Sequence, residues 1–102
     1  MRYEITSTKI FDRWLFRIKD RQAVKAILQR LVRVEAGNLG DVVPVGGQVS
    51  EMRIFTGKGY RIYFTIQNNR VIVLLCGGTK NSKKQQQQDI WQAKTILGIL
   101  EN

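Results

Sequence analysis

Three strand-like segments follow one another in the middle of the chain, and they constrain the fold more than any other feature. They span residues 49–55, 60–66 and 70–77. The first two flank the loop Thr56-Gly57-Lys58-Gly59, which predicts a β-hairpin. The next turn holds Asn68 and Asn69, which tolerate the positive φ of a tight turn. Residues 71–76 are apolar without alternation, as in a central strand buried on both faces.

The segments around this core predict three helices and one more strand. Residues 2–6 alternate polar and apolar and predict a short strand. Ser7 or Thr8 can cap a first helix, Asp20 can cap a second, and Gly37 with Asn38 can end it. The two helices should pack as an antiparallel hairpin. Their apolar stripes comprise Ile10, Phe11, Trp14, Leu15 and Ile18, then Val24, Ile27, Leu28, Leu31 and Val34.

Residues 37–48 hold the only proline and several glycines, so they predict a loop with at most a short extended piece. Residues 81–102 predict a last helix, whose apolar stripe is Ile90, Ala93, Ile96, Leu97 and Leu100. The expected order is β-α-α-β-β-β-α, in one domain over residues 1–102. We expect an α+β fold, with helices grouped on one side of a small, mostly antiparallel sheet.

The charge is strongly positive and uneven. The 102 residues carry 17 lysines and arginines against 8 acidic residues, a net charge of +9. Residues 52–102 hold 8 basic and 2 acidic side chains, so they carry +6 of this excess. A field of this sign attracts polyanions such as nucleic acid, an acidic partner segment or an anionic membrane surface, although a merely soluble cationic surface is an alternative.

Several functional classes do not fit the composition. The chain has no histidine and one cysteine, which excludes a Cys/His zinc site and a disulfide within the chain. Cys76 lies in the apolar run, so we expect a buried and inert thiol. No signal peptide is visible and no apolar stretch approaches the length of a membrane span, so a cytoplasmic protein without membrane contact is expected.

The hairpin carries the candidate site. Side chains alternate along a strand, so Met52 and Ile54 point to one face, as do the apolar residues of the second strand. If these apolar faces share one core, four other side chains must cluster on the outer face: Glu51, Arg53, Arg61 and Tyr63. Lys80, Lys83 and Lys84 follow the third strand and can reach the rim of this face.

Such a cluster suits cleavage of an RNA phosphodiester. The reaction needs a base for the 2′-hydroxyl proton, cations for the phosphate charge and a donor for the leaving oxygen. Arg53 and Arg61 provide planar forks for phosphate, Glu51 or a lysine could be the base, and Tyr63 could stack or donate a proton. No cofactor is expected. A metal-dependent nuclease is not expected either, because this face has one lone carboxylate and no histidine.

Two other interpretations stay open. Glu51 beside the arginines can be a cross-strand ion pair on a solvated sheet face, or the whole face can be a general nucleic-acid surface. Further basic residues can contact nucleic acid: Lys58 in the hairpin loop, Lys83 and Lys84, and Arg21 and Lys25 on the second helix. Basic stripes of this kind are most often solvated helix faces.

An ordered set of short motifs resembles the RelE/ParE toxin superfamily, and within it the HigB-like addiction-module killer proteins, also called phage Gp49-like. The motifs are Phe11-Asp12-Arg13-Trp14-Leu15, Asn38-Leu39-Gly40-Asp41-Val42, Ser50-Glu51-Met52-Arg53-Ile54, Gly59-Tyr60-Arg61-Ile62-Tyr63-Phe64 and Leu74-Leu75-Cys76-Gly77-Gly78-Thr79-Lys80. They extend over about residues 3–98.

The resemblance implies the toxin of a type II toxin–antitoxin system. Such a toxin cuts mRNA in the ribosomal A site without metal, and an antitoxin, often with a helix-turn-helix domain, neutralises it. Arg61 matches the family's phosphate-binding arginine, Glu51 and Arg53 match a Glu-x-Arg pair, and Lys80 matches a basic position after the last strand. The last helix lacks the tyrosine or His-Tyr pair of some relatives, so the acid and base stay open. Two alternatives remain: a ParE-like inhibitor of DNA gyrase, or an inactive module that binds nucleic acid or antitoxin.

Overall fold

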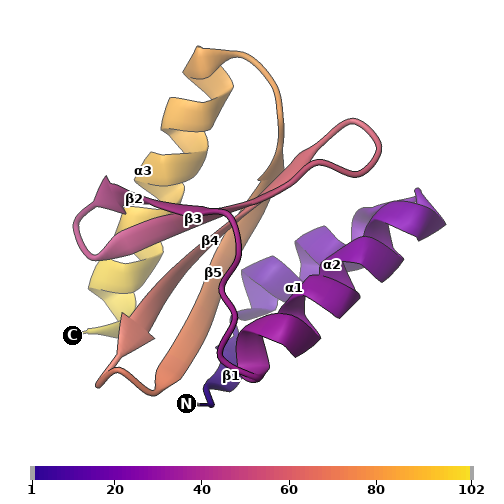
Figure 1. The fold of residues 1–102 in the computed structure, drawn as a ribbon. Helices are drawn as coiled ribbons and strands as arrows, with labels where there is room; N and C mark the ends of the chain where they lie inside the picture. Colours follow the sequence, from indigo (N-terminus) through magenta and orange to yellow (C-terminus); the bar gives the residue numbers. More distant parts are fainter. Residues whose placement is uncertain (1, 102) are drawn as a thin grey trace.

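A computed structural model describes residues 2–101 as one five-stranded sheet with three helices (Figure 1). The strand order is β1-β5-β4-β3-β2, and only the β1–β5 pair is parallel. The elements in chain order are β1 (Glu4–Ser7), α1 (Lys9–Arg17), α2 (Arg21–Glu35), β2 (Val42–Gly46), β3 (Val49–Ile54), β4 (Tyr60–Gln67), β5 (Val71–Thr79) and α3 (Lys83–Leu100). The α+β class is confirmed, with one strand more than expected.

The additional strand is β2, in the segment predicted as a loop with at most a short extended piece. It pairs antiparallel with β3, with Val42 opposite Met52. Its Pro44 has no N–H to donate, which a strand tolerates at the edge of a sheet, and β2 is an edge strand. The register shifts between Pro44 and Gly46, so a bulge interrupts the pairing before its last pair, Gly46 opposite Val49. Proline and glycine made the segment look like a loop, although they fit an irregular edge strand.

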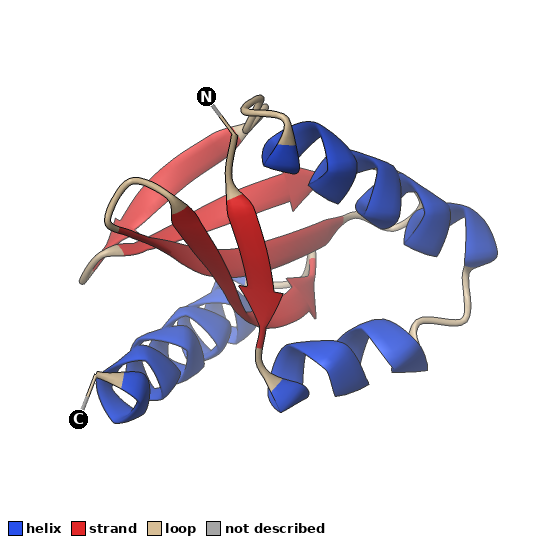
Figure 2. Cartoon of the chain, turned by 90° about the horizontal axis from the view of Figure 1, so that it is seen from below, coloured by secondary structure: helices blue, strands red, loops and turns tan. Residues whose placement is uncertain are grey.

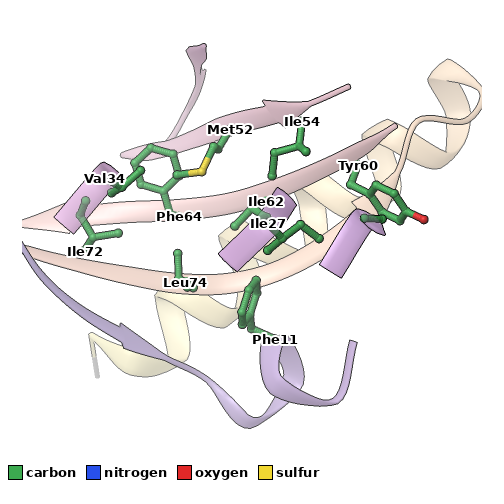
Figure 3. Packing of buried hydrophobic residues seen from close by; sticks show 11 residues of the cluster. Phe11, Ile27, Val34, Met52, Ile54, Tyr60, Ile62, Phe64, Ile72 and Leu74 are labelled. Carbon is green, nitrogen blue, oxygen red and sulfur yellow. The ribbon is translucent and has the colours of Figure 1, made fainter. Parts of the chain in front are cut away.

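The helices cover both faces of the sheet, so the expected grouping on one side is wrong. Helices α1 and α2 pack on one face and α3 crosses the other (Figure 2). The first core joins Phe11 and Ile27 to strand residues such as Ile62 and Leu74 (Figure 3). The second core comprises Val49, Tyr63, Val73, Leu75, Cys76, Ile90, Ala93, Ile96 and Leu97. Because β4 and β5 carry apolar side chains on both faces, each face needs its own cover.

A bulge in β5 enlarges the second core. Tyr63 lies opposite Cys76, whereas the next residue of β4, Phe64, lies opposite Leu74. Leu75 is therefore the extra residue of the bulge, and both Leu75 and Cys76 belong to the core under α3. The prediction that residues 71–76 form a strand buried on both faces is confirmed for 72–76.

Local signals placed the helix ends and turns correctly. The Thr8 hydroxyl accepts from the Phe11 N–H at 3.0 Å, and Asp20 accepts from two N–H groups of α2. Gly37, at φ 107°, ends α2 with a Schellman motif, in which the Gly37 and Asn38 N–H groups donate to the Val34 and Arg33 carbonyls. The turn residues Asn68 and Asn69 have φ of 54° and 53°, as predicted.

Three members of the predicted apolar stripes are exposed. Ile10, Leu28 and Leu100 have relative accessibilities of 40%, 49% and 50%. Helical spacing locates a stripe but not its width, and these residues lie at the stripe's margin or at a helix end. Of the described residues, none forms a helix both long and apolar enough to span a membrane.

Two glycines give a matched test of this packing. A Cβ on Gly77 would lie 2.4 Å from the Trp14 ring, whereas a Cβ on Gly98 of α3 would meet nothing within 4 Å. We expect Gly77→Ala to lower the free energy of unfolding by about 1–3 kcal/mol through overpacking. Gly98→Ala should raise it by about 0.5–1 kcal/mol, because alanine favours a helix. Urea unfolding measures both, and equal effects would contradict the packing described.

Because α3 covers Cys76, we expect the thiol of this residue to be unreactive. Cys76 is 1% exposed beneath α3, and burial, with a smaller effect of Asp89, raises the pKa of its thiol to about 12. Alkylation at mildly alkaline pH should therefore be slow in the folded protein and fast in denaturant. Mass spectrometry of the alkylated chain measures both rates, and equal rates would contradict the position of α3.

Candidate nucleic-acid interface

The four hairpin residues lie on one side of the sheet, but that side is not open. Glu51 lies opposite Tyr63, and Arg53 lies opposite Arg61. Helix α3 crosses this face, so Glu51 is 2% exposed and Tyr63 is fully buried. The predicted outer face is therefore an interior layer. Alternation located the face correctly but did not reveal the second helix layer above it.

Glu51 is the centre of a buried polar network. Its Oε2 accepts from the Tyr63 hydroxyl at 3.1 Å and from Nε2 of Gln86, in α3, at 2.8 Å. Its Oε1 lies 3.5 Å from Nε of Arg61. A buried carboxylate is tolerable only when charge-assisted bonds of this kind satisfy it. The network therefore joins β3, β4 and α3.

Gln86 was missed because the four glutamines looked like a solvated start of the helix. A signal was present, since residues 86, 90, 93 and 97 share one helical face. Three of them, Ile90, Ala93 and Leu97, are buried apolar residues. The apolar stripe thus extends one step back to a polar residue that meets Glu51.

Tyr63 is held as a hydrogen-bond donor. Burial raises its pKa well above the ordinary value, and the neighbouring Glu51 charge adds to the shift. Its proton therefore stays on the phenol and points at Glu51. In this arrangement neither group faces solvent.

Arg61 retains unused binding capacity. Its side chain is 14% exposed, and its Nη1 is buried without a hydrogen-bond partner among the described residues. Asp89 of α3 is a second carboxylate near Arg61. Burial raises the pKa of Asp89, whereas its hydrogen bond from Gln85 and, to a smaller extent, the positive charge of Arg61 lower it. An unsatisfied guanidinium donor favours an incoming anion.

Arg53 is engaged elsewhere, with Asp41. Its Nη2 lies 2.7 Å from Asp41 Oδ1, and that hydrogen bond is the main cause of the raised Arg53 pKa. Arg30, reaching from α2, holds the backbone carbonyls of Leu39, Asp41 and Arg53. Sequence reasoning missed Asp41 and Arg30 as partners, because both pairings join segments distant in the chain.

Positive charge gathers where β4 begins and β5 ends, a region we call the cationic end. It comprises Lys58, Arg61, Lys80, Lys83 and Lys84, and its four lysines are exposed. The backbone N–H of Lys80 donates to the Gly59 carbonyl at 3.0 Å. The Nζ atom of the Lys80 side chain lies 5.7 Å from the centre of the Phe55 ring. Lys83 and Lys84 occupy the first turn of α3, where the helix dipole is already positive.

The remaining predicted residues are elsewhere. Arg21 and Lys25 are exposed on α2, on the other side of the sheet from α3. They do not join the Glu51 network. Residues 2–101 contain no group of three or more histidine, cysteine, aspartate or glutamate side chains arranged to hold a metal ion.

Comparison with known proteins gives both a family and a fold. The family model described as phage derived protein Gp49-like matches residues 13–97. An uncharacterized protein of Haemophilus influenzae is 41% identical over 96 residues, which are 94% of each chain.

Two solved structures are similar in fold. A mutant of the Escherichia coli toxin RelE in the free state has a TM-score of 0.67 at 10% identity, over 90% of this chain and 98% of that one. The RelBE2 toxin–antitoxin complex of Mycobacterium tuberculosis gives 0.55 at 20% identity, over 78% of this chain and 100% of the matched chain. The resemblance that the sequence motifs suggested is thus confirmed: the chain has a RelE-like fold and belongs to the phage-derived Gp49-like family.

Proposed function

We propose that this chain is the toxin of a type II toxin–antitoxin system and cleaves mRNA on the ribosome without metal. The cationic end carries the proposal, because it concentrates four exposed lysines around an arginine with a free donor. The RelE-like fold and the toxin–antitoxin complex among similar structures support it. On this proposal the chain acts in the cytoplasm and pairs with an antitoxin, as the sequence motifs imply.

The proposed phosphate contacts come from Arg61 and Lys80. A phosphate oxygen would satisfy the unpaired Arg61 Nη1 once a local shift uncovered this buried atom, and Lys80 lies at the end of the neighbouring strand as an exposed residue. Lys58, Lys83 and Lys84 would hold the flanking backbone. Arg53 would contribute less directly to phosphate binding, since its guanidinium is paired with Asp41.

Proton transfer by Glu51 or Tyr63 would require a movement of α3. Both groups are buried, so the first two turns of α3 would have to shift before RNA reached them. Those turns contact the sheet through polar side chains such as Gln86, whereas the later turns use buried apolar ones. Opening the polar part would expose less apolar surface, which makes it the less costly movement.

Expression of the chain without antitoxin should stop growth and leave cut messages. Lys80→Ala should reduce cleavage about tenfold or more and Arg61→Ala about 100-fold, because each removes charge next to the reacting phosphate. Arg70→Ala is the matched control, since Arg70 is exposed in the turn at the far end of the sheet. RNA sequencing of cut ends, with circular dichroism of each variant, measures these effects. Intact messages during arrest would contradict the proposal.

Burial of both proton-transfer candidates favours a second function, inhibition of DNA gyrase by binding alone. That function needs no exposed acid or base. The purified chain would then block supercoiling by gyrase in a gel assay while ribosome-bound mRNA stayed whole. Cut mRNA with unaffected supercoiling would exclude this alternative. If the soluble, folded chain is harmless and inactive in both assays, it is an inactive binding module.

A further inference from the structure

A cavity of about 520 Å³ lies on the other side of the sheet from the Glu51 network. It opens between the connection from α1 to α2 and the β3–β4 loop, whose ribbons approach each other in Figure 1. Its lining includes Trp14, Arg17, Lys19, Asp20, Lys58 and Tyr60. The volume is typical of a site for a small ligand.

One wall of this cavity is a rigid aromatic surface. The Trp14 ring lies 5.6 Å from the Phe11 ring and meets the Tyr60 ring edge-on at 6.2 Å. Behind it, the ring packs closely against Gly77, where a Cβ would lie 2.4 Å from it. Trp14 itself is only half-buried, so part of it faces the cavity. A fixed aromatic wall of this kind suits a planar base, which gains stacking energy without ordering cost to the protein.

The rim is cationic. Arg17, Lys19 and Lys58 are exposed, and within residues 2–101 none of them forms an ion pair. They come from two separate segments that meet across the opening. Three uncompensated cations beside an aromatic wall favour a ligand that combines a flat ring with a phosphate.

Asp20 makes the site selective. Its Oδ1 accepts from the N–H groups of Gln22 and Ala23 at 3.0 and 3.2 Å, which caps α2. No residue between 2 and 101 donates a hydrogen bond to its Oδ2. A carboxylate only accepts hydrogen bonds, and it repels a bare phosphate. Guanine presents two adjacent donors, N1–H and N2–H, on its Watson–Crick edge, so it matches this oxygen better than the other bases do.

We propose that the cavity binds a guanine nucleotide. The base packs on Trp14, its Watson–Crick edge donates to Asp20, and its phosphate lies among Arg17, Lys19 and Lys58. This inference goes beyond the proposed function, because it concerns binding and holds whether or not the chain cuts RNA. A chain that does not bind a guanine nucleotide could still cut RNA, and a chain that does not cut RNA could still bind one, so the two experiments give separate results.

Tryptophan fluorescence tests the proposal directly. The chain has two tryptophans, and Trp91 is 68% exposed on α3 outside the cavity, so Trp91→Phe leaves Trp14 as the single reporter. Titration of this variant with GMP should give a saturable change. AMP should bind about tenfold more weakly, which corresponds to one well-made recognition contact. No saturable response to GMP, or equal affinities for GMP and AMP, would overturn the proposal.

The Asp20→Asn variant distinguishes the role of Asp20 in recognising guanine from its role in capping α2. Asparagine caps a helix as well as aspartate does, so the unfolding midpoint should stay the same. The affinity for GMP should fall about tenfold, while that for AMP should not fall. An unchanged preference for GMP would overturn the role of Asp20 and with it the proposal.

Two lysine variants distinguish binding of GMP in the cavity from non-specific attraction by the net positive charge. Lys58→Ala should weaken GMP binding several-fold, because it removes a rim cation. Lys94→Ala removes the same charge from an exposed position on α3, outside the cavity, and should leave the affinity unchanged. Equal weakening by both would indicate attraction by net charge alone and would overturn the site.

Discussion

The Glu51 carboxylate, buried between β3 and α3, is the interaction on which the second half of the structure depends. An isolated buried charge would be strongly destabilising. Here Tyr63 and Gln86 donate to it and Arg61 pairs with it. Because these partners come from β4 and α3, the same contacts that satisfy the carboxylate hold α3 across the sheet. Removal of any partner leaves the others with an uncompensated group, so the network should behave as a unit.

This network also decides which positive charges are available to a ligand. Glu51 and Asp89 offset part of the Arg61 charge, and Asp41 offsets part of the Arg53 charge. Over residues 2–101, no carboxylate pairs with Lys58, Lys80, Lys83 or Lys84. Four of the unpaired lysines thus gather where β4 begins and β5 ends. A polyanion would be attracted to that end first.

Local chemistry made much of the fold predictable. Alternation gave the two faces of the hairpin strands, paired asparagines gave the β4–β5 turn, and Thr8, Asp20 and Gly37 gave the helix ends. The misses have a common cause in long-range packing. Alternation assigns side chains to two faces but cannot say that a helix will cover the second one, so Glu51 looked exposed. The Asp41–Arg53 pair and the β2–β3 pairing likewise depend on segments that meet only in three dimensions.

On the proposed function, the cationic end acts on RNA held by the ribosome. Primer extension on an mRNA bound to purified ribosomes, incubated with the folded chain, tests it most directly. New ends are expected within the codon at the A site, and no such ends on the same RNA without ribosomes. A message that stays intact on the ribosome in the presence of folded protein would contradict it.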